Sequence, residues 1–121
     1  VVGILDWELS TLGHPIADFS YHCLSWRTQE AFWNEANLKE LGIPSEREYM
    51  EMYCENSGKD LSKNWEFYMA FNMFKIAGIL QGILGRVRDG TAASKHAEER
   101  GNMVFPLSEA AWSTIEENFL K

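Results

Sequence analysis

The sequence is poor in basic residues and in cysteine. Its 121 residues include 11 Lys and Arg against 18 Asp and Glu, a formal net charge of −7. Non-specific nucleic-acid binding depends on Lys and Arg that neutralise phosphates, so this balance argues against nucleic acid as a partner. The two cysteines, Cys23 and Cys54, lack the spacing of a zinc site and are too few for a disulfide framework. We therefore expect free thiols and a reducing, intracellular location; cytoplasm, mitochondrion and peroxisome are not distinguished.

Long uncharged runs are also missing. The most apolar stretch, residues 65–84, contains Glu66 and Lys75, and its uncharged runs are shorter than the roughly 18 residues expected of a spanning helix. This stretch predicts a buried helix and no transmembrane segment. The chain starts with Val1 in an apolar run that has neither a basic flank nor a cleavage-type site, so we expect no signal peptide. We interpret the sequence as the middle of a longer protein.

One short β-type segment precedes a series of helical patterns. Residues 1–7 are apolar and β-branched at their start, which favours a buried strand. Because a lone strand needs partners for its backbone N–H and C=O groups, we expect its neighbours to precede Val1. Pro15 suits the first position of a helix over 15–26. Its apolar stripe is Ile16, Phe19, Cys23 and Trp26.

Further helices are predicted downstream. Composition favours a helix over 29–41, with Phe32, Ala36 and Leu41 on its inner face. Ser45 and Glu48 match a capping box that starts the next helix, whose inward side chains are Tyr49, Met52 and Tyr53.

A central helix is predicted over 64–84, because this segment is apolar on nearly every side. Within it, Gly78 and Gly82 either allow another helix to approach closely or are simply tolerated. Residues 86–94 predict a loop, and residues 95–120 are helical in pattern with a break before Pro106. The predicted apolar stripe of this last segment is Trp112, Ile115 and Phe119.

Two sets of charged residues are candidates for ligand contacts. Along a strand, Asp6 and Glu8 would lie on the same side with Trp7 on the other, so both carboxylates could face one hard cation. From this spacing alone, a solvated strand end is the more ordinary interpretation. Arg86, Arg88 and Lys95 could meet an anionic substrate, and the alternative is a solvated helix end and loop.

The segment around Asp6 carries a resemblance to a known family. Ile-Leu-Asp-Trp-Glu at 4–8, Ser-Thr-Leu-Gly-His-Pro at 10–15 and Ala-Asp-Phe at 17–19 resemble the aminoglycoside phosphotransferase and choline kinase-like superfamily. The match continues less sharply to residues 90–92, and it most resembles the kinase-like domain of acyl-CoA dehydrogenase family members 10 and 11. It implies that residues 1–121 are the C-terminal portion of one domain. The expected structure is mainly α: the helical C-terminal subdomain of a bilobal α+β kinase-like fold, with a short β-strand at its start.

The resemblance also implies roles for individual residues. Asp6 corresponds to the aspartate that binds magnesium between the β- and γ-phosphates, and Glu8 is a weaker second or water-mediated ligand. Asp18 corresponds to the helix-start aspartate that holds the backbone of the catalytic loop. Its alternative role, an acid favoured by the helix dipole, is compatible with the first. His14 stands where many relatives have an acid.

The implied activity is that of an ATP-dependent small-molecule phosphotransferase, which transfers the γ-phosphoryl group to a substrate hydroxyl and uses Mg²⁺ and ATP. A hydroxyacyl-CoA is the acceptor that the resemblance suggests. The family's His-Gly-Asp with an Asn five residues after the Asp is missing from the sequence, as is the nucleotide-binding lobe. We therefore expect the general base upstream of Val1 and no activity from this chain alone.

The expected partners are the nucleotide, a small-molecule hydroxyl substrate, the rest of the kinase-like domain and a following acyl-CoA dehydrogenase domain. Two other classes of function stay open at this point. One is a non-catalytic, kinase-shaped binding or scaffolding module. The other is an independently folded helical interaction domain.

Overall fold

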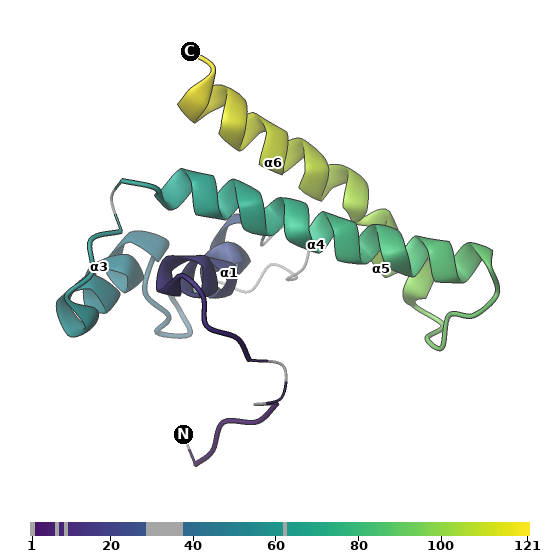
Figure 1. Ribbon diagram of the computed structural model, residues 1–121, viewed down its shortest axis with the longest axis horizontal. Coiled ribbons are helices and arrows are strands. Elements are labelled where there is room, and N and C mark those ends of the chain that lie inside the picture. The colour runs from purple at the N-terminus through teal and green to yellow at the C-terminus, as the bar shows by residue number, and fades with distance from the viewer. Residues whose placement is uncertain (1, 7, 9, 29–37, 62) are drawn as a thin grey trace.

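The computed structural model describes residues 2–6, 8, 10–28, 38–61 and 63–121, and the principal elements of this part are helices. These are α1 (Pro15–Arg27), α3 (Glu46–Ser57), α4 (Trp65–Arg88), α5 (Ala97–Asn102) and α6 (Val104–Phe119). In Figure 1, α4 runs through the middle of the molecule, with α6 on one side and α1 and α3 on the other. Helix α4 packs against α1, α5 and α6. The prediction of a mainly α chain with a central helix is confirmed.

The predicted strand is not formed in the described residues 2–6. Val2 and Leu5 are almost fully exposed, and the chain before α1 extends away from the helices in Figure 1. A strand is stable only when a neighbour satisfies its backbone N–H and C=O groups. No described residue supplies such a neighbour, so this part of the prediction is wrong for the chain as it stands.

Helix α1 begins at Pro15, as predicted, and ends one residue later than expected. Ile16, Phe19 and Cys23 of its apolar stripe are buried. Trp26 is only partly buried, and its indole Nε1 donates a hydrogen bond of 2.9 Å to the carbonyl of Pro44. The stripe therefore packs against α4 for most of its length and meets the chain before α3 at its end.

The capping box of α3 is formed as predicted. The Glu48 N–H donates to Ser45 Oγ at 3.3 Å, and the Ser45 N–H donates to the Glu48 carboxylate at 2.8 Å. Tyr49 and Tyr53 pack against the core, but Met52 is 50% exposed, so its predicted inward position is wrong. Both tyrosine rings contact Phe19 of α1, with centroids 5.3 and 3.9 Å apart, and Met50 and Cys54 of α3 also pack against the core.

Helix α4 is one turn longer than predicted. Arg86 and Arg88, which we expected in a loop, lie in its last turn. Basic side chains at a helix C-terminus interact favourably with the helix dipole, which supports this extension. Gly90 then adopts a φ of 71°, the left-handed conformation that commonly ends a helix.

The break before Pro106 is confirmed, because α5 ends at Asn102 and α6 begins at Val104. The inner face of α6 is different from the one predicted. Val104, Leu107 and Ala111 are buried, whereas Trp112 and Phe119 are 57% and 51% exposed. Two neighbouring arcs of α6 are apolar with the same period, so periodicity does not indicate which of them faces α4.

The close approach between helices occurs at Gly101, and not at Gly78 or Gly82. A Cβ atom at Gly101 would lie 2.5 Å from Cδ2 of Leu84, while Gly78 and Gly82 have open space around them. The absence of a side chain at Gly101 therefore lets α5 pack against α4. Gly78 and Gly82 lie on an exposed part of α4.

The predicted helix over 29–41 falls mainly outside the described residues, as do Phe32 and Ala36. The described residues 38–42 form a turn, in which Gly42 N–H donates to the carbonyl of Lys39 at 3.1 Å. Leu41, expected on an inner face, is 66% exposed.

By length and composition, α4 is long and apolar enough to cross a membrane, and a third of its most apolar window is buried inside the structure. A buried core helix passes the same test. Asn72, in the first half of α4, is buried and hydrogen-bonded to α1, which is typical of a helix inside a protein core.

Candidate functional site

Asp6 and Glu8 lie in the segment before α1, and both are exposed. Asp6 has a φ of 61° and is the non-glycine residue with positive φ in the described part of the chain. This conformation costs an L-residue roughly 1–2 kcal/mol, although Asp tolerates it better than most. Such strained residues cluster at functional sites. The strand alternation expected to align Asp6 with Glu8 is absent here, and Trp7 lies outside the described residues.

The Asp6 carboxylate suits a magnesium ion by its chemistry. Magnesium prefers oxygen ligands and is usually bound by one or two carboxylates together with water and substrate phosphates. Within the described ranges no three His, Cys, Asp or Glu side chains are grouped closely enough to form a metal cage. An exposed carboxylate that shares its ion with a nucleotide is compatible with this arrangement.

The start of α1 is held by His14, whose structural role the sequence did not reveal. His14 Nδ1 accepts a hydrogen bond of 3.3 Å from the Ile16 N–H, and its ring stacks on Tyr68 of α4 with the centroids 5.2 Å apart. Asp18 follows in the first turn of α1, where the helix dipole favours a negative charge. Its carboxylate is exposed and has no hydrogen-bond partner among the described residues.

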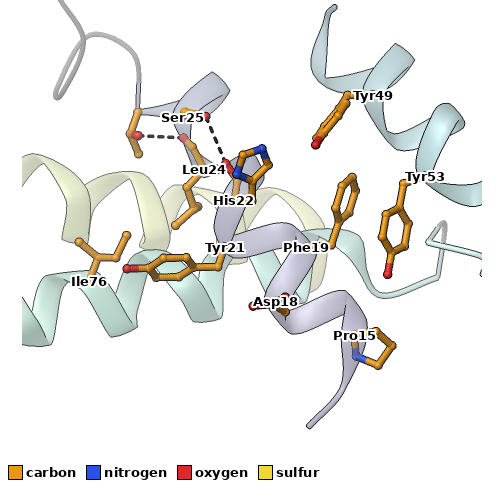
Figure 2. Close-up of a pocket in the computed structure, with 11 residues that line it drawn as sticks. Pro15, Asp18, Phe19, Tyr21, His22, Leu24, Ser25, Tyr49, Tyr53 and Ile76 are labelled. Atoms are coloured by element: carbon orange, nitrogen blue, oxygen red, sulfur yellow. Dashed lines mark hydrogen bonds between the residues drawn. The ribbon is translucent and has the colours of Figure 1, made fainter. Parts of the chain in front are cut away.

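A cleft of about 1010 Å³ lies beside α1, between this helix and α3. Figure 2 shows Phe19 of α1 directed towards Tyr49 and Tyr53 of α3. The Phe19 and Tyr53 rings stack with centroids 3.9 Å apart. The lining residues are Pro15, Asp18, Phe19, Tyr21, His22, Leu24, Ser25, Thr28, Tyr49, Tyr53 and Ile76. Aromatic walls with one carboxylate at the edge can accommodate a planar or apolar group that carries a hydroxyl.

Asn72 of α4 connects this helix to α1 by hydrogen bonds. Its Nδ2 donates to the carbonyl of Ala17 at 2.9 Å and to Ser20 Oγ at 2.8 Å. Both Asn72 and Ser20 are buried, and buried polar groups are costly unless hydrogen-bonded. These bonds therefore fix the position of α1, and with it Asp18, relative to α4.

A second polar junction, also missed by the sequence analysis, connects α1, α3 and α4. Arg27 forms ion pairs with Glu46 at 2.7 Å and with Glu66 at 2.6 Å, and the Trp65 indole donates to Glu46 at 2.8 Å. The hydrogen bonds to Glu66 and Glu46 raise the pKa of Arg27 above its already high ordinary value. These partners lie 19 and 39 residues from Arg27, so no local spacing indicates them.

The three candidate contacts for an anion, Arg86, Arg88 and Lys95, are exposed at the far end of α4 and in the following loop. Arg88 pairs with Asp89 at 3.2 Å. Helix α1 crosses the first half of α4 near Asn72, which at 1.5 Å per residue is roughly 24 Å along the axis from Arg88. The structure therefore does not bring these bases to the α1/α3 cleft.

Both cysteines are free, as predicted. Cys23 is completely buried, and burial, assisted by the negative charge of Glu46, raises its pKa to about 12. A thiol with so high a pKa is not a nucleophile near neutral pH. Cys54 is partly buried.

Comparison with known proteins links the segment around Asp6 to an enzyme family. Residues 1–53, which include Asp6, Glu8 and Asp18, match the model of the phosphotransferase enzyme family. This match makes residues 1–53 similar to a phosphotransferase-like kinase fold, and α4, α5 and α6 lie outside the matched residues. No solved structure matches the chain significantly.

The chain is also similar to curated proteins along nearly its whole length. It is 43% identical to acyl-CoA dehydrogenase family member 10 of Mus musculus over 93% of this chain and 11% of that protein. It is 36% identical to family member 11 of Homo sapiens over 98% of this chain and 16% of that protein. For the probable acyl-CoA dehydrogenase IBR3 of Arabidopsis thaliana, the identity is 36% over 95% of this chain and 15% of that protein.

The chain thus spans about a sixth or less of these relatives. Over residues 1–53 it resembles the phosphotransferase enzyme family, and over almost its full length it resembles one segment of acyl-CoA dehydrogenase family members 10 and 11.

Proposed function

We propose that this chain is the C-terminal, helical portion of an ATP-dependent phosphotransferase domain that transfers a γ-phosphoryl group to the hydroxyl of a small molecule. The observation that carries the proposal is the family match over residues 1–53, because it includes all three acidic candidates, Asp6, Glu8 and Asp18. The α1/α3 cleft, with Asp18 at its edge, supports this assignment.

Asp6 is the proposed magnesium ligand. In phosphotransfer, Mg²⁺ bridges phosphate oxygens and neutralises the charge that develops on them. The exposed Asp6 carboxylate and its left-handed backbone conformation are compatible with a side chain that is directed to a ligand and not into the core. Glu8 is the weaker candidate and would contact the ion directly or through water.

Asp18 is a proposed positioning residue for the catalytic loop. It stands in the first turn of a helix that His14 caps and that Asn72 fixes to α4. A carboxylate on so well fixed a helix can accept hydrogen bonds from a neighbouring backbone and hold it in one conformation. The general base and the nucleotide-binding lobe would belong to other parts of the longer protein.

The proposed acceptor is a hydroxyacyl-CoA. Support comes from the names of the relatives, which are acyl-CoA dehydrogenase family members, and from the exposed bases Arg86, Arg88 and Lys95. Guanidinium and ammonium groups bind phosphates, which coenzyme A carries at the end remote from the acyl group. An elongated ligand of this kind can contact two separate surfaces of the domain.

The test is product formation by the longer protein that contains this chain. With Mg²⁺ and ATP, we expect a hydroxyacyl-CoA to gain one phosphoryl group, detected by mass spectrometry together with stoichiometric ADP. The matched acyl-CoA without the hydroxyl is the control and stays unmodified. Nucleotide binding without any phosphorylated hydroxyl product would contradict the proposal and favour the non-catalytic binding module.

A further inference from the structure

A groove of about 370 Å³ between α4 and α6 is lined almost entirely by apolar side chains. Phe67, Phe71 and Phe74 line it from α4, and Trp112 and Ile115 line it from α6. Phe74 is 74% exposed and Trp112 is 57% exposed. Large contiguous apolar patches mark interaction sites, and the exposed aromatic side chains make this groove a candidate for one.

The side chains of the groove are spaced to receive a helix. The α4 residues recur at i, i+4 and i+7, and Ser108, Trp112 and Ile115 repeat the same spacing on α6. Each set therefore forms one ridge along its helix, and the two helices pack side by side. A third helix that places an apolar ridge between two others is the usual way to bury such a surface.

The rim of the groove on α6 is acidic. Helix α6 contains Glu109, Glu116 and Glu117 and neither Lys nor Arg. Glu109 and Glu116 lie three residues before and four residues after Trp112, so they are its neighbours on the helix surface. A helix that covers the groove would place Lys or Arg beside its apolar face to complement this rim.

Two other occupants are disfavoured by the same charges. A second copy of the chain would bring two acidic rims together, and the chain already carries a formal charge of −7. A membrane surface with anionic lipids would repel Glu109 and Glu116. The face of α4 opposite the groove is not open to a further helix, because it already packs against α1 through the buried Asn72.

We propose that the α4/α6 groove is the docking surface for an amphipathic helix, basic along its flank, that belongs to the remainder of the phosphotransferase domain. This inference rests on the proposed function, because it takes the partner to be the rest of that domain. Phe71 and Trp112 are its central contacts, and the acidic rim sets the charge of the helix that binds.

The first experiment measures the accessibility of Trp112 in the longer protein. Acrylamide quenching of the native protein is compared with that of its Trp112→Phe variant, and the difference isolates the Trp112 signal. We expect Trp112 to be shielded from acrylamide although this chain leaves it more than half exposed. Quenching at the rate of a free indole would overturn the proposal.

The second experiment compares two substitutions in the longer protein. Phe71→Asp places a charge inside the groove, whereas Met52→Asp alters a side chain of similar exposure, 50% against 47%, on α3 outside the groove. We expect Phe71→Asp to lower the melting temperature by roughly 5 °C or more beyond the effect of the control. Equal shifts would contradict docking at the groove.

Two further readouts identify a different occupant. A dimer that Phe71→Asp converts to a monomer, seen by light scattering, would assign the groove to a second copy and overturn the proposal. Shielding of Trp112 that appears only with anionic vesicles would assign the groove to a membrane and would also overturn the proposal.

ATP turnover is measured on the same samples, so that the two proposals can fail separately. Shielding of Trp112 without turnover would refute the proposed function alone. Turnover with an exposed Trp112 would refute the docking alone.

Discussion

Cys23 lies on the face of α1 that packs into the core, with none of its surface exposed. Its pKa of about 12 leaves roughly one thiol in ten thousand ionised at pH 8. We therefore predict that Ellman's reagent at pH 8 modifies only Cys54 in the native chain, and both cysteines in denaturant. Two equally fast thiols in the native state would contradict the burial of Cys23, and the Cys54→Ser variant assigns the reactive group.

Asn72 provides a prediction about the buried junction between α1 and α4. Asn72→Ala removes the donor to Ala17 and Ser20, so we expect the free energy of unfolding to fall by about 1–3 kcal/mol. Asn64→Ala is the matched control, because the Asn64 side chain caps no backbone group of α4. Its effect should stay within about 0.5 kcal/mol, and a comparable loss in both variants, measured by urea denaturation, would contradict the role of Asn72.

At the scale of elements, the packing of α5 on α4 depends on Gly101. A Cβ there would overlap Leu84, so we predict that Gly101→Ala destabilises the chain by about 1–3 kcal/mol. The control is Gly78→Ala, which adds the same methyl group to open space in a helix interior. That change should stabilise the chain by about 0.5–1 kcal/mol, and thermal unfolding that shows the same sign for both would contradict the packing.

The capping box at the start of α3 predicts a dependence on pH. Hydrogen bonds from the Ser45 side chain and backbone hold the pKa of Glu48 below its ordinary value of 4.5. A lowered pKa in the folded state means that the stabilisation is present above pH 4.5 and is lost as the pH falls through the folded pKa.

We therefore expect Glu48→Gln to lower the melting temperature at pH 7 and to have a decreasing effect below pH 4.5. Glu55→Gln, an exposed change on the same helix outside the capping box, controls for the loss of one charge. A difference between wild type and Glu48→Gln that does not change with pH would contradict the assigned hydrogen bonds.

Features that depend on residues within one helical turn were predicted correctly from the sequence. Features that depend on contacts between distant parts of the chain were not. Pro15, the Ser45 capping box and the break before Pro106 all depend on residues within one turn, and all three are confirmed. The strand before Asp6 failed because a strand depends on partners from elsewhere. The inner face of α6 and the contact at Gly101 depend on which helix packs against which, and periodicity does not determine that.

For the molecule as a whole, the sequence indicated the candidate site residues. It did not indicate the long-range contacts that hold α1 in place beside them. The resemblance around residues 4–19 pointed to Asp6, Glu8 and Asp18, and the family match includes all three. The contacts that fix α1 next to them, from Asn72 and from Arg27 to Glu46 and Glu66, join residues 19 to 55 positions apart. Such contacts follow from the fold, and the sequence gives no local pattern for them.

The described residues form three separate candidate surfaces, namely the aromatic cleft beside α1, the bases at the end of α4 and the apolar groove between α4 and α6. Each suits a different ligand, and α4 connects them because it packs against α1, α5 and α6. This arrangement is compatible with the proposal that the chain is one part of a larger phosphotransferase domain.

The most direct test of that account is the effect of Asp6→Asn on magnesium-dependent ATP turnover by the longer protein. If Asp6 binds the ion that stabilises the transferring phosphoryl group, the variant should lose at least about 10²-fold in kcat. Glu55→Gln, which removes one charge from an exposed position of α3 outside every proposed site, should leave turnover unchanged. Undiminished turnover in Asp6→Asn would contradict the assignment of Asp6 as the magnesium ligand.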